Sequence, residues 1–357
     1  MILFFLLPLI LLTIAAVNFV QIRTPKAISE LKDSVGVVVP MRNEAENVEG
    51  IVATLSAQDG PFHFYLLDDN SEDSTFELLQ RFTAGDIRFT VIKGAPLADG
   101  WIGKTWALQQ LFEASNEEVL VSIDADVRLR NDAINKAVTA LNSAQLDFIS
   151  PYPRQIAKTF AERLIQPLLQ WSWLTTVPLR YAERSGQKSM AVANGQFLIV
   201  KRQAYFNSGG HAAIKSEVLD DLMLAKQLLE HGYKGGVAEG SQVAKCQMYQ
   251  NNSELFKGYQ KSLWKAFGSL PGTILAIMLL ITTGVLPIVN ALLGSTTGLI
   301  AFGLIAISRV IASLRTSSLP NTALLHPIAT ILLLVLIAYS WFGKMTKSLT
   351  WRDRSVI

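Results

Sequence analysis

The chain has 357 residues, of which 50% are apolar and 17% are charged, and its net charge is +3. A soluble protein usually carries about 25% charged residues, so this composition indicates membrane segments joined to a globular domain. The small net charge, without a basic run interleaved with aromatic residues, argues against a nucleic acid partner. Cys246 is the single cysteine, which excludes an internal disulfide and a cysteine metal cluster, and the four histidines lack metal-binding spacing.

The chain begins with an almost purely apolar segment over residues 1–20, which is about long enough to cross the hydrocarbon of a membrane. A cleaved signal peptide would carry its positive charges before the apolar region. Here Arg23 and Lys26 come after it. We therefore expect an uncleaved anchor over residues 1–22, with the N-terminus outside and the next domain in the cytoplasm.

Residues 34–268 have a globular composition in which strand and helix patterns alternate. Buried strands appear as short apolar runs, and amphipathic helices show a period of 3.6 residues. We expect strands at 35–40, 62–67, 88–92 and 119–123, and helices at 44–57, 74–82 and 104–114. This alternation predicts an α/β domain of βαβ units with a mostly parallel sheet.

The fourth predicted strand ends in two carboxylates, Asp124 and Asp126. Ligands of open α/β sheets bind beyond the carboxyl ends of the strands. Residues two apart on a strand point to the same face, so the two charges repel unless water or a cation separates them. Taken alone, the pair fits either an acidic turn in solvent or a cation site.

The other predicted strands also end in polar residues. Asp68 and Asp69 follow the second strand, and a turn that caps the next helix explains residues 70–75 but does not require these two acids. Arg42 and Glu44 follow the first strand. We expect all of these side chains at one edge of the sheet.

Gly103 and Lys104 open the helix predicted before the fourth strand. The N-terminus of a helix favours an anion, and a lysine there could contact a phosphate or a sugar. The pair lacks the full spacing of a P-loop, so a solvated helix lysine remains the alternative.

Four ordered motifs together resemble those of family 2 glycosyltransferases of the GT-A fold. They are Val-Val-Pro-Met-Arg-Asn-Glu at 38–44, Asp-Asp-Asn-Ser-Glu-Asp-Ser-Thr at 68–75, Gly-Lys at 103–104 and Asp-Ala-Asp at 124–126. The resemblance covers residues 34–268. It implies a nucleotide-sugar-binding α/β domain with a mostly parallel mixed sheet, and an inverting enzyme of the hexosyltransferase type.

The resemblance also implies roles for single residues. Those expected to bind the donor, a nucleotide sugar with UDP as the expected nucleotide, are Pro40, Arg42, Glu44, Asp68, Asp69, Lys104 and Asp124. Asp126 is the expected main metal ligand, with Asp124 beside it. The cation would be Mg²⁺ or Mn²⁺, since both suit carboxylate and phosphate oxygens and need only one or two protein carboxylates.

The family's general base lies in an acidic pair at the start of a later helix, which matches Asp220 and Asp221 here. We expect Asp221 to be the base. The apolar spacing of Leu222, Ala225 and Leu228 marks the amphipathic helix that follows. The helix dipole also favours acids in a first turn, and both explanations can hold at once.

Processive members of the family carry a Gln-x-x-Arg-Trp motif. This chain has Gln260 and Trp264 but no arginine, and Lys261 or Lys265 lacks the planar fork of arginine. The departure argues against polysaccharide synthesis. We expect Gln260 and Trp264 on the acceptor or diphosphate side, and the segment 194–197 near the acceptor.

Three apolar segments follow, at residues 271–293, 298–314 and 323–342, within a membrane region that we place at 271–343. The basic tail over 344–357 should stay cytoplasmic. Three crossings after a cytoplasmic domain would put that tail outside. Our hypothesis is therefore two crossings, with 298–314, which contains Arg309, re-entrant or in the interface.

The acceptor is indicated by membrane features. Residues 160–181 are rich in leucine and tryptophan, interrupted by prolines, and fit either a membrane-surface element or a core helix in the second half of the catalytic domain. Apolar segments on both sides of the catalytic domain imply a membrane-resident substrate. The tail at 349–354 resembles that of the hopanoid-associated and carotenoid glycosyltransferase branch, with Asp353 where a glycine is usual.

The sequence therefore predicts a multi-pass cell-membrane enzyme that moves a sugar to a hydroxyl of a membrane lipid, such as a hopanoid, a carotenoid or another glycolipid. Two alternatives remain. A polyprenyl-phosphate acceptor is already an anion and needs no base. A non-catalytic membrane protein could retain the fold.

Overall fold

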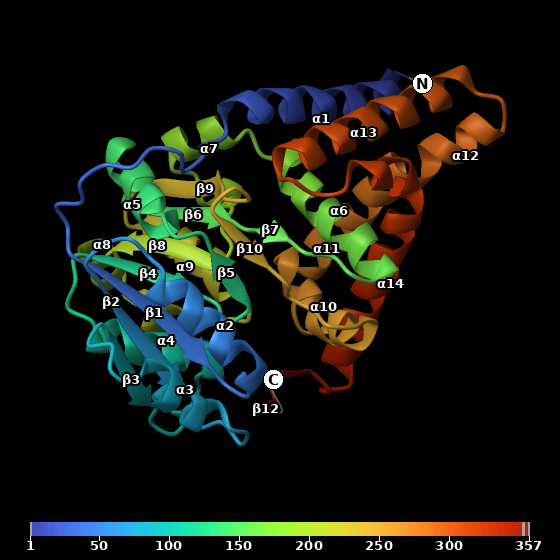
Figure 1. Ribbon diagram of the computed structural model, residues 1–357. Coiled ribbons are helices and arrows are strands. Elements are labelled where there is room, and N and C mark those ends of the chain that lie inside the picture. Colours follow the sequence, from blue (N-terminus) through green and yellow to red (C-terminus); the bar gives the residue numbers. More distant parts are fainter. Residues whose placement is uncertain (1, 352–353, 356–357) are drawn as a thin grey trace. The chain divides into compact units, whose positions relative to one another are not determined.

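The computed structural model describes residues 2–351 and 354–355. Two compact units make up the chain (Figure 1). The α/β unit consists of Arg23–Arg154 and Tyr181–Gln247. The helical unit combines the chain up to Ile22 with Gln155–Arg180 and the part from Met248 onward.

A mixed sheet forms the centre of the α/β unit. Its strand order is β3-β2-β1-β4-β8-β6-β9. The strands are β1 Val35–Met41, β2 Phe62–Asp68, β3 Phe89–Lys93, β4 Val119–Ile123, β6 Phe148–Tyr152, β8 Phe197–Lys201 and β9 Gly235–Glu239. β8 runs antiparallel to both β4 and β6, and the other neighbouring pairs are parallel. The mostly parallel mixed sheet confirms the predicted fold class.

Helices cover both faces of this sheet, which explains why its strands are continuous apolar runs. Val37 and Val39 of β1 point into one core with helices α2, α3 and α5, and Val38 points into the other core with α4, α8 and α9. The helices are α2 Ala45–Ser56, α3 Thr75–Thr83, α4 Gly103–Ala114, α5 Ala133–Ser143, α8 Arg202–Asn207 and α9 Asp220–Glu230. The strands and helices predicted up to residue 123 lie within two residues of these bounds.

Shorter elements connect the main ones. They are β5 Val127–Leu129, β7 Arg154–Gln155, α7 Leu179–Ser185, β10 Ala244–Cys246, β11 Thr350–Trp351 and β12 Arg354–Ser355, with 3₁₀ turns η1 Lys188–Met190 and η2 Gly210–Ile214. β5 pairs antiparallel with β10, which brings Val127 opposite Cys246.

The helical unit contains α1 Ile2–Gln21, α6 Phe160–Thr176, α10 Asn252–Ala266, α11 Leu270–Leu280, α12 Leu286–Leu292, α13 Thr296–Arg315 and α14 His326–Met345. A π-helical turn, η3 Ile281–Val285, joins α11 to α12, and a 3₁₀ segment, η4 Pro320–Leu325, precedes α14. α13 lies side by side with α1 (Figure 1).

Among the described residues, three helical stretches are long and apolar enough to cross a membrane: Leu270–Leu292, Thr296–Arg315 and Pro320–Met345. Phe5–Gln21 is a shorter apolar helix. The segment expected to be re-entrant is a continuous helix of 20 residues. Its path through a membrane stays a prediction.

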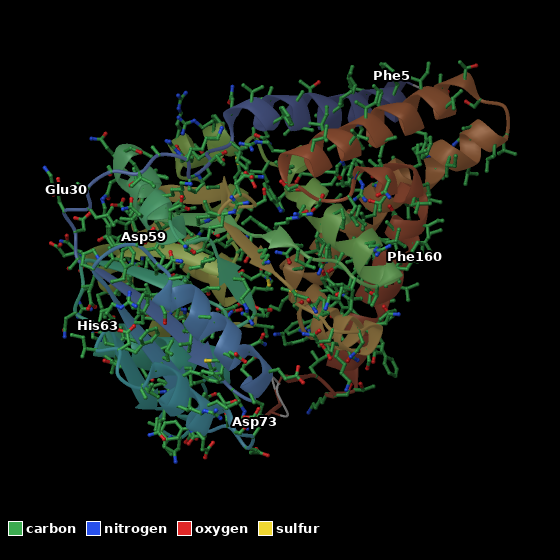
Figure 2. The ribbon with its side chains drawn as sticks, in the orientation of Figure 1. Phe5, Glu30, Asp59, His63, Asp73 and Phe160 are labelled. Atoms are coloured by element: carbon green, nitrogen blue, oxygen red, sulfur yellow. The ribbon has the colours of Figure 1, made fainter. Side chains whose placement is uncertain are left out.

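The leucine- and tryptophan-rich segment forms α6, which packs against α1, α13 and α14. Thr159 and Glu162 begin this helix with a reciprocal capping box, while the side chain of Phe160 is exposed (Figure 2). Leu164, Leu168 and Trp171 are buried. This segment therefore belongs to the core of the helical unit and not to the second half of the α/β domain, where one of the two interpretations placed it.

Candidate functional site

The acidic pair lies in a turn at the carboxyl end of β4. The backbone N–H of Val127 donates to the carbonyl oxygen of Asp124 at 3.1 Å, so the chain leaves the strand before it reaches Asp126. Asp124 donates its own N–H to the carbonyl oxygen of Gln196 at 3.2 Å. The turn gives the two carboxylates different partners, in contrast to the shared strand face that the spacing suggested.

Asp126 is the less compensated member of the pair. Its Oδ1 is buried and has no hydrogen-bond partner, and the Cys246 thiol donates to its carboxylate. Burial, together with the charge of Asp124, raises the pKa of Asp126 to about 7. A bound cation would relieve both effects, so these residues suit a divalent metal.

Within the described residues, no three His, Cys, Asp or Glu side chains converge on one point. A cation here would therefore take one or two protein carboxylates and complete its shell with ligand and water oxygens. Mg²⁺ binds in this way beside substrate phosphates. The donor set fits Mg²⁺ or Mn²⁺ held by Asp126 and Asp124.

Lys104 connects the acidic pair to helix α9. Its Nζ is 2.9 Å from Asp124 Oδ1 and 3.6 Å from Asp220 Oδ2. Burial disfavours its charge, but the two carboxylates outweigh burial and raise the pKa of Lys104. The lysine lies in the first turn of α4, as predicted, and it is an ion-paired residue rather than a solvated one.

Asp221 is held by two backbone amides in the first turn of α9. Its Oδ2 accepts from the N–H of Gly195 at 2.8 Å, and its Oδ1 accepts from the N–H of Leu222 at 2.7 Å. Burial, then the charge of Asp220, raises the pKa of Asp221 to about 6. A carboxylate with this pKa is ionised at neutral pH and can still accept a proton efficiently.

The helix after Asp221 is amphipathic, with one change from the expected pattern. Leu224, Ala225, Leu228 and Leu229 are its buried residues. Leu222, in the first turn, is only partly buried, and its backbone N–H donates to the Asp221 carboxylate.

The segment 194–196 lies between the two acidic groups because β8 runs antiparallel to β4. This pairing puts Phe197, at the amino end of β8, opposite Ile123, at the carboxyl end of β4. A Cβ atom on Gly195 would lie 3.3 Å from both Asp221 Cβ and Lys104 Nζ. The close approach explains why a glycine stands here.

Ser150 on β6 anchors that segment and was not predicted. Its Oγ accepts from the N–H of Asn194 at 2.8 Å and donates to the carbonyl oxygen of Asn194 at 3.0 Å. Asn194 Oδ1 accepts from the N–H of Gln196 at 2.8 Å. A serine within the otherwise apolar stretch 148–151 was the available sequence signal.

The predicted nucleoside residues shape the loops after β1 and β2. Arg42 is buried and donates through Nη1 to the carbonyl oxygens of Asp69, at 2.8 Å, and Asn70, at 2.5 Å. Asp68 Oδ2 accepts from the N–H of Ser71 at 3.3 Å. The Asp69 side chain is buried beside them. Arg42 thus fixes the position of the loop that carries the two acids.

Pro40 and Glu44 are partly buried at the end of β1 and before α2. Glu44 Oε2 accepts from Asn47 Nδ2 at 2.7 Å. Asp73 lies just before α3, and its Oδ1 accepts from the backbone N–H of Thr75, the first residue of that helix, at 3.0 Å (Figure 2).

Gln260 and Trp264 belong to the helical unit. Both lie on α10, where Ser340 Oγ of α14 donates to the carbonyl oxygen of Gln260 at 2.5 Å and accepts from the N–H of Trp264 at 2.9 Å. The Lys344 ammonium is 4.4 Å from the Trp264 ring centroid. Within this unit, their observed contacts join α10 to α14.

The chain is similar to known glycosyltransferases in sequence and in fold. The model of the Glycosyl transferase family 2 matches residues 36–223. Two 4,4'-diaponeurosporenoate glycosyltransferases of Staphylococcus aureus are 25% identical to the chain. The one from strain bovine RF122 / ET3-1 aligns over 69% of this chain and 65% of its own length, and the one from strain USA300 over 68% and 64%. The chain thus spans slightly less than two thirds of these relatives.

Among solved structures, the mannosyltransferase PcManGT from Pyrobaculum calidifontis, in complex with GDP-Man and Mn²⁺, is similar in fold. Its TM-score is 0.59 at 19% identity, covering 96% of this chain and 95% of that one. The family match alone extends over more than half of the sequence. The chain belongs to glycosyl transferase family 2.

Proposed function

We propose that this protein is a multi-pass membrane glycosyltransferase that moves a sugar from a nucleotide sugar to a hydroxyl of a membrane lipid, with inversion at the anomeric carbon. The observation that carries the proposal is one connected group: Lys104 contacts Asp124 and Asp220, and Asp126 and Asp221 flank these acids. The group combines a cation site, a fixed positive charge and a candidate base at one sheet edge.

Asp126 and Asp124 form the donor half of the site. They would hold Mg²⁺ or Mn²⁺, which when bound supplies positive charge to the nucleotide diphosphate leaving group. Lys104 adds a positive charge that stays in place throughout the reaction. The Mn²⁺ and GDP-Man bound to PcManGT support a divalent cation and a nucleotide sugar as ligands here. UDP remains the expected nucleotide.

Asp221 is the proposed base. Its carboxylate takes the proton from the acceptor hydroxyl while the hydroxyl oxygen attacks the anomeric carbon opposite the diphosphate, and the bond to the diphosphate breaks. A single displacement inverts the configuration. The two amide donors from Gly195 and Leu222 orient the carboxylate before the acceptor arrives.

The membrane assignment rests on the long apolar helices of the helical unit. We propose an anchor at 1–22, a catalytic domain at 34–268, a membrane region at 271–343 and a basic tail at 344–357. The catalytic domain lies on the cytoplasmic side, since Arg23 and Lys26 follow the first apolar helix. The names of the Staphylococcus aureus relatives support a carotenoid-type lipid acceptor.

The full chain in lipid nanodiscs tests the proposal through release of nucleotide diphosphate from UDP-sugars and GDP-mannose, with Mn²⁺ and a membrane lipid extract. We expect turnover that depends on the metal and is lost in Asp126→Asn. Asp132→Asn is the matched control, because Asp132 pairs with Lys136 one helical turn away at 2.6 Å and touches none of the proposed site residues. If the unaltered protein neither turned over a nucleotide sugar nor bound a nucleotide, the proposed glycosyltransferase activity would be refuted.

A further inference from the structure

A buried arginine lies in α13 of the helical unit. The Arg309 side chain is 0% exposed. Its Nη2 makes one long hydrogen bond, 3.4 Å to Thr322 Oγ1, while its Nε and Nη1 are buried without a partner. In the part of the chain that the structure describes, no carboxylate forms an ion pair with it.

A second buried base lies beside this arginine. His326, at the start of α14, is 1% exposed, and neither of its ring nitrogens has a hydrogen-bond partner. It lies four residues after Thr322, the hydrogen-bond partner of Arg309, and Trp171 contacts both His326 and Ser308, the residue before Arg309. Its ring meets the edge of Trp171 of α6 with centroids 4.8 Å apart. We call Arg309, Thr322 and His326 the basic cluster.

The neighbouring polar groups do not supply a negative charge. The Trp171 indole N–H donates to Ser308 Oγ at 2.8 Å. On α6, Gln166 is buried with both amide atoms unpartnered, and Gln170 accepts from Thr316 at 3.1 Å. Ordered water could satisfy single N–H groups, but it would leave the guanidinium charge unbalanced.

The chemistry of the cluster selects its ligand. A guanidinium stays protonated in proteins, offers only donors, and binds two oxygens of a carboxylate or phosphate at once. A charged residue within a membrane helix is costly unless it is paired, so such a residue marks a functional site with a partner. The partner missing from the basic cluster is an anion with at least two oxygens.

The surroundings select the carrier of that anion. The outer faces of α13 and α14 expose apolar side chains, among them Leu299, Ile307, Leu314, Ile328 and Ile331. Because hydrocarbon surrounds such faces in a membrane, they suit the apolar part of a lipid that carries the anion, whereas a free ion would lose its hydration without any apolar contact.

We propose that the basic cluster binds the anionic end group, a carboxylate or a phosphate, of a membrane lipid. Arg309 forms the charged contact, and Thr322 and His326 complete the oxygen-binding set. The inference rests on the membrane location in the proposed function and is independent of the sugar-transfer chemistry.

Fluorescence quenching tests this site in the full chain, in phosphatidylcholine nanodiscs without nucleotide or metal. The probes are a brominated fatty acid, a brominated phosphatidate and, as the uncharged-head control, a brominated phosphatidylcholine. Trp171 touches His326 and reports binding, and Trp171→Phe identifies its signal. We expect saturable quenching by the anionic probes. Their half-maximal quenching should occur at concentrations at least tenfold below that of the phosphatidylcholine probe.

Arg309→Gln should weaken binding of the anionic probes at least tenfold, whereas Arg309→Lys should retain part of this binding. Arg315→Gln, a control on the same helix, should bind the anionic probes as well as the unaltered protein does. Lipid-stripped Arg309→Gln should melt at or above the temperature of the unaltered protein, because the substitution removes an unpaired buried charge. A purely structural arginine would instead lower the melting temperature. That result, or equal quenching by all three probes, would overturn the proposal.

Mass spectrometry of lipids that stay bound to the protein purified from its own membranes identifies the source of the anion. A retained acidic lipid that gains a sugar on addition of nucleotide sugar and Mn²⁺ is the acceptor. A retained phospholipid that gains none is a resident lipid. The quenching assay contains no nucleotide, so it measures lipid binding alone. A negative result there would refute anion binding by the basic cluster without bearing on the proposed enzyme activity.

Discussion

The two units both bury charge, but they balance it differently. In the α/β unit, Lys104 lies between the carboxylates of Asp124 and Asp220, so neighbouring side chains offset its charge. In the helical unit, Arg309 is fully buried and has no ionic partner among the described residues. The first arrangement has its countercharges within the chain, whereas the proposed lipid anion would supply the countercharge of the second.

The sign of the charge left over differs as well. Around Lys104, the acids Asp124, Asp126, Asp220 and Asp221 outnumber the bases even when Arg128, which interacts with Asp126, is counted, so this region suits a cation. The basic cluster has the opposite excess and suits an anion. The uncompensated charge in each unit thus predicts the sign of the charge on its ligand. The substitutions below test this prediction for the α/β unit.

The largest effect is expected for Asp221→Asn, which removes the proposed base while its size and one oxygen are kept. We expect kcat to fall about 10²- to 10⁴-fold with little change in donor binding, measured by nucleotide diphosphate release and nucleotide titration. Asp220→Asn should cost much less. A loss below about threefold would contradict a hydroxyl acceptor and favour a phosphate acceptor, which needs no base.

Lys104→Met leaves Asp124 and Asp220 facing each other without the cation between them. We expect kcat/KM to fall by about 10²-fold, the range for loss of one preorganised charge contact, and nucleotide diphosphate binding to weaken. Lys136→Met, which breaks a surface pair, is the control. Unchanged kinetics in Lys104→Met would show that the α/β charges do not act as one group.

The pH dependence of the activity reports the protonation state of the proposed base, Asp221. Because burial raises the pKa of Asp221 to about 6, its carboxylate is ionised above that pH and protonated below it. Activity should therefore fall as the pH drops through about 6, by about tenfold per pH unit. In Lys104→Met the loss should begin at a higher pH, since a nearby positive charge favours the ionised carboxylate. A profile that is flat between pH 5 and pH 7 would contradict the assignment.

The smallest effect is expected for Gly195→Ala. The new Cβ would lie 3.3 Å from both Asp221 Cβ and Lys104 Nζ, so these side chains must shift by a few tenths of an ångström. We expect kcat to fall about tenfold through misplacement of the base, with an unchanged melting temperature. Gly236→Ala, where no atom lies within 4 Å of the added Cβ, should leave both unchanged.

Local patterns predicted the regular elements up to β4 because these strands are buried on both faces and the helices between them have a single apolar face. They also placed Lys104 at a helix start and the acids at strand ends. What the spacing of Asp124 and Asp126 did not reveal was the turn between them, which gives their carboxylates different partners.

Contacts between distant segments lay beyond local patterns. Cys246 reaches Asp126 because β10 pairs with β5, and Gly195 reaches Asp221 because β8 is antiparallel in the sheet. Neither pairing has a signal in the local sequence. Arg309 first counted against a membrane span, and the structure gives it another meaning, since its side chain is fully buried within the helical unit.

The pairing of α1 with α13 has a consequence for biosynthesis. α1 ends at Gln21 and α13 begins at Thr296, so about 275 residues emerge from the ribosome between them. At about 5–20 residues per second, the first helix waits roughly 14–55 s for its partner. The α/β unit is complete at Gln247, before α13 is made. Asn18, whose side chain donates to the carbonyl oxygens of Leu174 and Val177, obtains both acceptors only after α6 has been synthesised.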